Sequence, residues 1–145
     1  MATSNAIQSF VEPLAKLSPD LRIRAVVVDD YPEIVSAVQF FLQRSGVENV
    51  GSASNGRLGV ELVHSTHPDL VIMDVNMPEM NGLLASAEIR SLLPDTKIIV
   101  MSADEDPDLA SAALESGADD FLSKMKLSLL SHHVARLFPE RIRVE

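Results

Sequence analysis

Residues Leu70 to Gly82 read LVIMDVNMPEMNG, and the pattern of this segment is the clearest indication of the fold class. Its four leading apolar residues form a run typical of a strand that is buried on both faces of a parallel sheet. The run ends at the carboxylate of Asp74, and Pro78 and Asn81-Gly82 follow as turn signals. Ligands bind beside the carboxyl ends of strands in open α/β sheets, so Asp74 is a candidate site residue. Taken alone, it could equally cap the following turn, because Asp is common at strand ends.

Apolar runs and amphipathic segments alternate on both sides of this strand. The segments between the runs repeat apolar residues at the helical period. We expect strands at residues 23–28, 47–53, 70–74, 97–102 and 119–124, with helices within residues 32–46, 56–66, 82–93, 107–117 and 127–138. Helix-length crossovers join parallel strands, so the sequence predicts an α/β fold with a doubly wound, five-stranded (βα)5 parallel sheet.

The composition limits the classes of protein to which the chain can belong. Its 145 residues suit one domain, and 46% apolar residues are enough for a core. The chain has no Cys, which excludes disulfides and thiolate sites and agrees with a cytoplasmic protein. No apolar run reaches membrane-spanning length, and the first residues do not resemble a secretory signal. A net charge of -9 argues against direct nucleic-acid binding.

The two ends of the chain differ from its centre. We expect an N-terminal extension at residues 1–20, a domain at residues 21–140 and a C-terminal tail at residues 141–145. The extension repeats apolar residues at helical spacing but contains Pro13 and Pro19. Residues 6–17 could therefore pack as an extra helical turn near Phe40 on the first helix, or they could be a frayed terminus.

Polar residues follow four of the five expected strands. Parallel strands share one carboxyl edge, which would gather Asp29, Asp30, Asp74, Ser102 and Lys124. Neighbouring carboxylates repel each other, and a Mg²⁺ ion relieves that repulsion because it prefers oxygen ligands. The ammonium of Lys124 suits a phosphoryl oxygen, and the hydroxyl of Ser102 could donate to another. A carboxylate in such a setting can act as the nucleophile of phosphoryl transfer.

Four motifs resemble those of the receiver domain of two-component response regulators. They are VVVDD, VIMDVNMPEMNG, IVMSA and GADDFLSK, and the resemblance covers residues 22–138. It implies a flavodoxin-like sheet with strand order 2-1-3-4-5, like that of chemotaxis regulators. It also implies that the domain is not an enzyme but a phosphoacceptor that assists its own phosphorylation and dephosphorylation.

The resemblance implies roles for individual residues. Asp74 would be the phosphoacceptor, and Ser102 and Phe121 would form the switch. The implied Mg²⁺ ligands are Asp29 (mostly through water), Asp30, Asp74 and the backbone carbonyl of Asn76. The implied phosphoryl-binding residues are Ser102, Ala103 and Lys124. Readout would occur on the face made by the fourth helix, the fifth strand and the fifth helix.

Partners also follow from the resemblance. A sensor histidine kinase or a histidine phosphotransfer protein would supply the phosphoryl group, and the output partner is unknown. A homodimer could form through the readout face. Many receivers have Pro after the lysine, joined by a cis bond, whereas Met125 stands here, so we expect a trans bond or a strained exception. That variant often precedes a DNA-binding domain, and this chain ends at Glu145 as a stand-alone regulator or as a fragment of a longer one.

Other interpretations have weaker support in the sequence. A receiver fold could act as a scaffold that needs no phosphorylation, but such proteins usually lack some of the acidic residues. A Mg²⁺-dependent phosphatase with an Asp nucleophile needs an acid two residues later, where this chain has Asn76. His64 and His67 could bind a metal, but they are better explained as residues at a helix end. Met73, Met77, Met101 and Met125 are expected to pack beside the strands.

Overall fold

A computed structural model describes residues 22–141 and contains one parallel five-stranded sheet. The elements in chain order are β1 (Arg24–Val28), α2 (Pro32–Arg44), β2 (Glu48–Ala53), α3 (Gly56–Thr66), β3 (Leu70–Asp74), α4 (Gly82–Leu92), β4 (Lys97–Ser102), α5 (Pro107–Glu115), β5 (Asp120–Ser123), the 3₁₀ helix η2 (Lys124–Leu129) and α6 (Leu130–Leu137). The strand order is β2-β1-β3-β4-β5, which confirms the expected fold class and topology.

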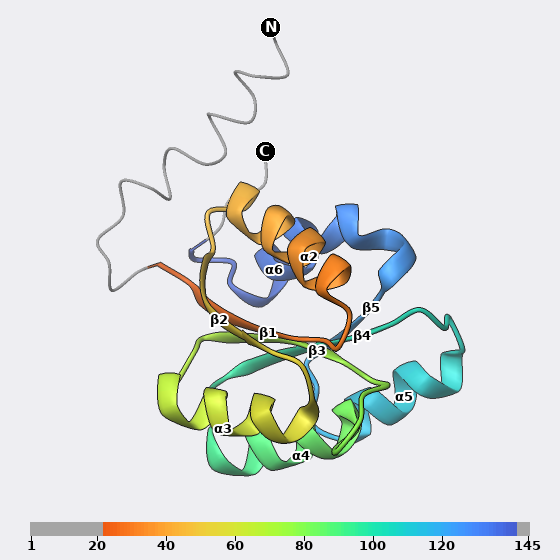
Figure 1. Cartoon of the computed structure of the whole chain (residues 1–145). Helices are drawn as coiled ribbons and strands as arrows, with labels where there is room; N and C mark the ends of the chain where they lie inside the picture. Colours follow the sequence, from red (N-terminus) through yellow and green to blue (C-terminus); the bar gives the residue numbers. More distant parts are fainter. Residues whose placement is uncertain (1–21, 142–145) are drawn as a thin grey trace, which may run out of the picture.

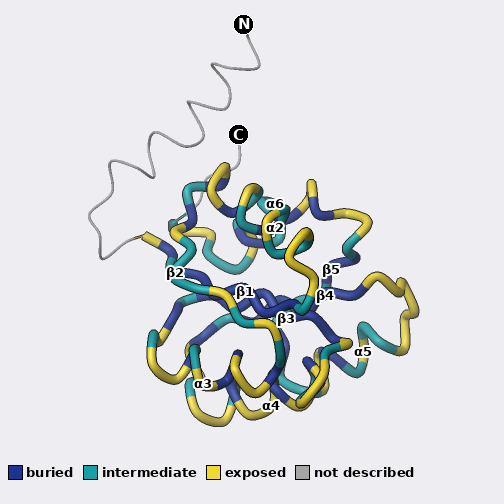
Figure 2. Tube along the Cα trace, in the orientation of Figure 1, coloured by how far each residue is buried: buried dark blue, intermediate teal, exposed yellow. Residues whose placement is uncertain are grey.

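Helices cover both faces of the sheet. Figure 1 shows α2 and α6 on one face and α3, α4 and α5 on the other. Each face has its own apolar cluster, with Leu42 and Leu130 in one and Val63 and Ile89 in the other. Every residue of β3 is buried, and the buried strands form the centre of the molecule in Figure 2. A strand buried on both faces explains the apolar run that precedes Asp74.

The segment after β5 differs from the expectation of a single helix. Lys124–Leu129 forms a 3₁₀ helix with a kink at Lys126, and α6 begins only at Leu130. Ser123 caps this turn, because its hydroxyl accepts a hydrogen bond from the backbone N–H of Met125. Leu127 and Leu130 are both buried. Their spacing suits a 3₁₀ turn as well as an α-helix, so the apolar pattern could not distinguish the two.

The surface of the described residues bears on several expectations. Phe40 is 52% exposed, as expected for the outward side of α2. Met125 was expected to pack but is 80% exposed, because the 3₁₀ turn directs its side chain to solvent. The expected helical turn at residues 6–17 lies outside the described residues, so its contact with Phe40 stays a proposal. No helix within residues 22–141 has the length and apolar character needed to cross a membrane.

Candidate functional site

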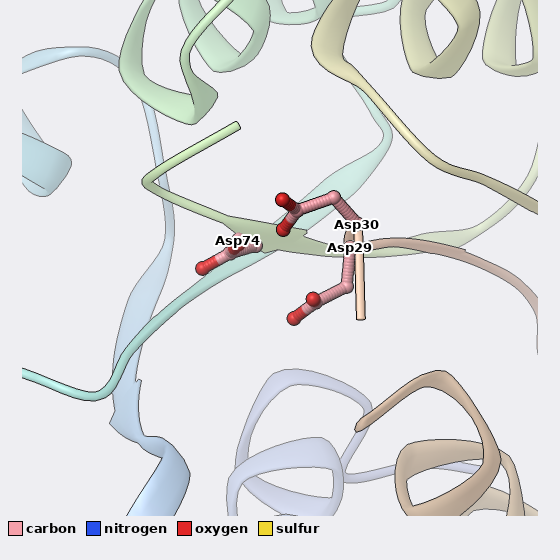
Figure 3. A group of neighbouring side chains, drawn as sticks. All are labelled: Asp29, Asp30 and Asp74. Carbon is pink, nitrogen blue, oxygen red and sulfur yellow. The ribbon is translucent and has the colours of Figure 1, made fainter. Parts of the chain in front are cut away.

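The acidic cluster follows from the pairing of β1 with β3. Val28 pairs with Met73 in parallel register, so Asp29 and Asp74 meet at the carboxyl edge of the sheet. Asp30 follows in the loop that leads to α2. Each of the three carboxylates offers an oxygen, and these atoms lie within 4.8 Å of one another. Figure 3 shows the cluster beside the ends of these two strands.

Lys124 reaches this cluster from the carboxyl end of β5, where it directly follows Ser123. Its Nζ lies 2.7 Å from Oδ2 of Asp29 and 3.0 Å from Oδ1 of Asp74. The side chain of Lys124 is 10% exposed, and those of Asp29 and Asp74 are 0% and 4% exposed. None of the described peptide bonds is cis, so Lys124 makes both contacts with the expected trans bond to Met125.

Burial and repulsion give the site an unusual charge balance. Burial raises the pKa of Asp74 to about 6, and Asp29 and Asp30 add to this rise, while Lys124 opposes it. Burial alone would lower the pKa of Lys124, but its bonds to Asp29 and Asp74 raise that pKa above its usual value. The raised pKa of Asp74 and the raised pKa of Lys124 are compatible, because Lys124 lies beside two opposite charges whereas Asp74 also lies near two like charges. The cluster therefore holds more negative charge than Lys124 balances.

The unbalanced charge and the free oxygens fit a divalent cation. Oδ1 of Asp30 and Oδ2 of Asp74 are buried and have no hydrogen-bond partner among the described residues. Buried carboxylate oxygens are normally satisfied, so two that converge without donors suit a metal ligand set. Hard oxygen ligands match Mg²⁺, which needs only one or two carboxylates from the protein. His64 and His67 are not part of any such cluster in the described part of the chain.

The other expected site residues surround this cluster less closely. Ser102 is buried, but its hydroxyl accepts a hydrogen bond from the N–H of Asp104 at 2.9 Å. Its own O–H is not used in that bond, so the hydroxyl can still donate to a group on Asp74. Asn76 and Ala103 are exposed in the loops beside the site. Phe121 lies partly buried against the cluster beneath α3, α4 and α5.

Two further residues have close contacts to the site: Tyr31 was not singled out from the sequence, and Gly82 was noted only as a turn signal and helix start. The ring of Tyr31 lies 5.6 Å from Nζ of Lys124, measured to the ring centroid. Gly82 packs so closely on β3 that a Cβ there would lie 1.9 Å from the carbonyl oxygen of Asp74. The available signals were that Tyr31 directly follows the Asp pair and that Gly82 begins the helix after the Asp74 loop.

The raised pKa of Asp74 predicts a pH-dependent gain in stability for Asp74→Asn in metal-free buffer. Folding raises this pKa from 3.8 to about 6, so the contribution of Asp74 to stability is full below pH 3.8 and is lost as the pH rises through 6. The Asn variant cannot acquire the buried negative charge. Its advantage over the unmodified protein should grow to about 1–3 kcal/mol by pH 7. Urea unfolding at several pH values measures it, and a constant difference from pH 4 to pH 8 would contradict it.

Comparison with known proteins identifies the family. A family model described as the response regulator receiver domain matches residues 25–135. The chain belongs to the response regulator receiver domain family. It is 40% identical over 101 residues to the chemotaxis protein CheY of Thermotoga maritima, covering 70% of this chain and 84% of that protein. The receiver domain of the putative response regulator NarL from Mycobacterium tuberculosis superposes with a TM-score of 0.76 at 34% identity, covering 83% of this chain and 98% of that domain.

Some relatives of this receiver domain are longer proteins. A putative transcriptional regulator of Pseudomonas aeruginosa is 36% identical over 101 residues, which are 70% of this chain and 49% of that regulator. The chain thus spans about half the length of that relative. Receiver domains are phosphoacceptors that bind Mg²⁺ through an acidic pocket and interact with histidine kinases or phosphotransfer proteins. Membership of the family confirms the resemblance that the sequence motifs indicated. The residue roles that the resemblance implies remain expectations.

Proposed function

We propose that this receiver domain is a phosphorylation switch in which Asp74 accepts a phosphoryl group. The observation that carries the proposal is the contact of one ammonium, that of Lys124, with the buried carboxylates of Asp29 and Asp74. A nucleophilic carboxylate beside a fixed positive charge is what phosphoryl transfer requires. Its second oxygen, Oδ2, has no hydrogen-bond partner among the described residues, so it is free to bind a metal or to attack phosphorus.

The transfer reaction balances with a phosphohistidine donor. A carboxylate oxygen of Asp74 forms the new bond to phosphorus, and the bond between phosphorus and the donor's imidazole nitrogen breaks. The electron pair stays on that nitrogen, which takes up a proton, and Asp74 becomes an aspartyl phosphate. Lys124 exchanges its bond to Asp74 for one to a phosphoryl oxygen. The hydroxyl of Ser102 and the backbone N–H of Ala103 bind the remaining oxygens in this proposal.

The acidic cluster is the proposed Mg²⁺ site. Asp30 and Asp74 would hold the ion with the backbone carbonyl of Asn76, and Asp29 would act mostly through water. Bound Mg²⁺ would supply positive charge that offsets the repulsion among the carboxylates and the developing charge of the phosphoryl group. The two buried oxygens without partners, on Asp30 and Asp74, support this assignment.

The partners belong to the proposal. The phosphodonor is a sensor histidine kinase or a histidine phosphotransfer protein in the cytoplasm, and relatives that are bacterial regulators support this setting. The longer relatives support an effector region or a separate output partner, neither of which the described residues include. The proposed receiver is residues 21–140, with residues 1–20 as an extension and residues 141–145 as a tail, and the family match over residues 25–135 lies within that receiver.

The test of the proposed function is a labile adduct on the full chain. The protein is incubated with acetyl phosphate in Mg²⁺ or in EDTA, and intact mass is followed with time. We expect one phosphoryl group per chain, dependent on Mg²⁺ and lost at alkaline pH as acyl phosphates are. A chain that gains no mass under these conditions, while still folded, would refute the function. Labelling that is equal in EDTA would refute the metal site.

Readout is proposed for the face made by α5, β5 and α6. A phosphoryl group brings up to two negative charges, so a bond donated by the Ser102 hydroxyl is charge-assisted, and the hydroxyl can form it while it accepts from the N–H of Asp104. Ser102 and Phe121 lie in neighbouring paired strands, because Val100 pairs with Phe121 and Ser102 pairs with Ser123. Movement of Ser102 would therefore change the space beside Phe121. Phe121 lacks a hydroxyl, so packing alone would bias it, and we expect a coupling on the order of 1–3 kcal/mol.

We predict that the phosphoryl mimic beryllofluoride shifts amide signals along this face. The change should extend from the loops around Asp30 and Asp74 through residues 102–125, because Ser102 and Phe121 move together. Two-dimensional amide NMR with Mg²⁺, with and without the mimic, measures it. Amides of α3, which lies across the sheet from α6 in Figure 1, serve as the internal control. Shifts that stay within the two acidic loops would show that the switch mechanism is wrong.

A further inference from the structure

Tyr31 lies between the acidic loop and Lys124. It directly follows Asp29 and Asp30 and is the residue that precedes α2. Its backbone N–H donates a hydrogen bond to Oδ1 of Asp29 at 2.9 Å. The residue is 58% exposed, and Nζ of Lys124 lies 5.6 Å from the centroid of its ring. One residue therefore fixes the carboxylate through its backbone and contacts the ammonium through its ring.

The ring contact completes the surroundings of the Lys124 ammonium. Asp29 and Asp74 bind it within the site, and the ring of Tyr31 approaches it from the surface. Lys124 is only 10% exposed although the next residue, Met125, is 80% exposed. A cation beside an aromatic face is attracted by the ring quadrupole, more strongly where water is excluded. The ring thus favours a position of the ammonium above the acidic cluster.

We propose that Tyr31 is a positioning residue that holds the Lys124 ammonium in place to bind a phosphoryl group on Asp74. This inference rests on the proposed role of Asp74. Lysine has a flexible stem with many rotamers, and it must exchange a carboxylate oxygen for a phosphoryl oxygen when the group arrives. An ammonium already confined by the ring loses less conformational entropy on making that bond. Only the face of the ring is used, so the hydroxyl of Tyr31 is not required.

The experiment measures the affinity of the full chain for beryllofluoride in Mg²⁺ by titration calorimetry. Tyr31→Ala removes the ring, and Tyr31→Leu keeps an apolar side chain but has no aromatic face. Both variants are expected to bind the mimic about five- to thirtyfold more weakly than the unmodified protein. Tyr31→Phe keeps the face and should restore affinity to within about threefold. Because the side chain of Tyr31 is largely exposed, thermal unfolding of all three variants should stay close to that of the unmodified protein.

Phe40→Ala is the matched control. Phe40 is also an exposed aromatic residue of α2 beside a cation, since its ring centroid lies 5.3 Å from Cζ of Arg44. The ring contacts that the described structure gives Phe40 are with Arg44 and Phe41, neither of which belongs to the acidic site, so its removal should leave the affinity unchanged. The single Tyr of the chain, in the absence of Trp, gives a second readout. The emission of Tyr31 should change when beryllofluoride binds.

The outcomes separate this inference from the proposed function. Affinity of Tyr31→Ala or Tyr31→Leu equal to that of the unmodified protein would overturn the positioning role, while mimic binding itself would still support the function. Affinity of Tyr31→Phe as weak as that of Tyr31→Ala would overturn the role of the ring face. No binding of the mimic by the unmodified, folded protein would instead refute the proposed function.

Discussion

Asp74→Asn is expected to abolish phosphoryl incorporation from acetyl phosphate. Asn has nearly the same shape, but its amide is not a nucleophilic carboxylate and cannot form an acyl phosphate. The variant should fold, because the change removes a carboxylate that is costly to bury in its charged form. That cost is seen in the pKa of Asp74, which burial raises to about 6. We expect the initial rate of labelling, followed by intact mass in Mg²⁺, to fall at least about a hundredfold.

Asp95→Asn provides the control for this loss. Asp95 is an exposed residue just before β4, at the end of that strand opposite to Ser102, and its replacement should leave labelling unchanged. Labelling of Asp74→Asn at the rate of the unmodified protein would refute Asp74 as the acceptor. Residual labelling that maps to Asp29 or Asp30 would show that the cluster can use a second carboxylate and would still leave Asp74 as the main acceptor.

The fold was predictable because strands and helices differ in sequence pattern. The buried run before Asp74 and the helical spacing in the crossovers fixed the element types, and the observed elements follow them closely. The strand order came from the family resemblance, because apolar patterns do not determine which strands are neighbours. The 3₁₀ turn at Lys124–Leu129 was missed, because buried residues at i and i+3 suit either helix type.

The candidate site was predictable to the extent that it depends on topology. Parallel strands place their carboxyl ends on one edge, which explains why Asp29, Asp30 and Asp74 meet. Side-chain directions were not predictable in the same way. Nothing in the sequence shows that the Ser102 hydroxyl accepts from Asp104, or that Tyr31 turns its ring toward Lys124. Those contacts depend on rotamers and loop paths that the packing of the whole domain selects.

Gly82→Ala is expected to destabilise the domain more than any surface substitution. Gly82 is the first residue of α4, and its N–H donates to the carbonyl of Val75 at 2.8 Å. A Cβ at this position would lie 1.9 Å from the carbonyl oxygen of Asp74 and 2.9 Å from Cα of Val75. Both obstacles are backbone atoms, so no side-chain rotation can relieve the overlap. Either α4 or the end of β3 must shift, and we expect a loss of roughly 3 kcal/mol or more in the free energy of unfolding.

Gly51→Ala is the matched control for this loss. The atoms nearest to a Cβ at Gly51 would all belong to the side chain of Leu62, the nearest at 3.1 Å, and this side chain can move by a small rotation. Its replacement should change the unfolding free energy by less than about 1 kcal/mol. Urea unfolding of both variants measures the difference. Because the overlap in Gly82→Ala falls on the backbone of Asp74, the variant should also bind beryllofluoride more weakly wherever it remains folded. A Gly82→Ala protein as stable as Gly51→Ala would contradict the close packing of α4 on β3.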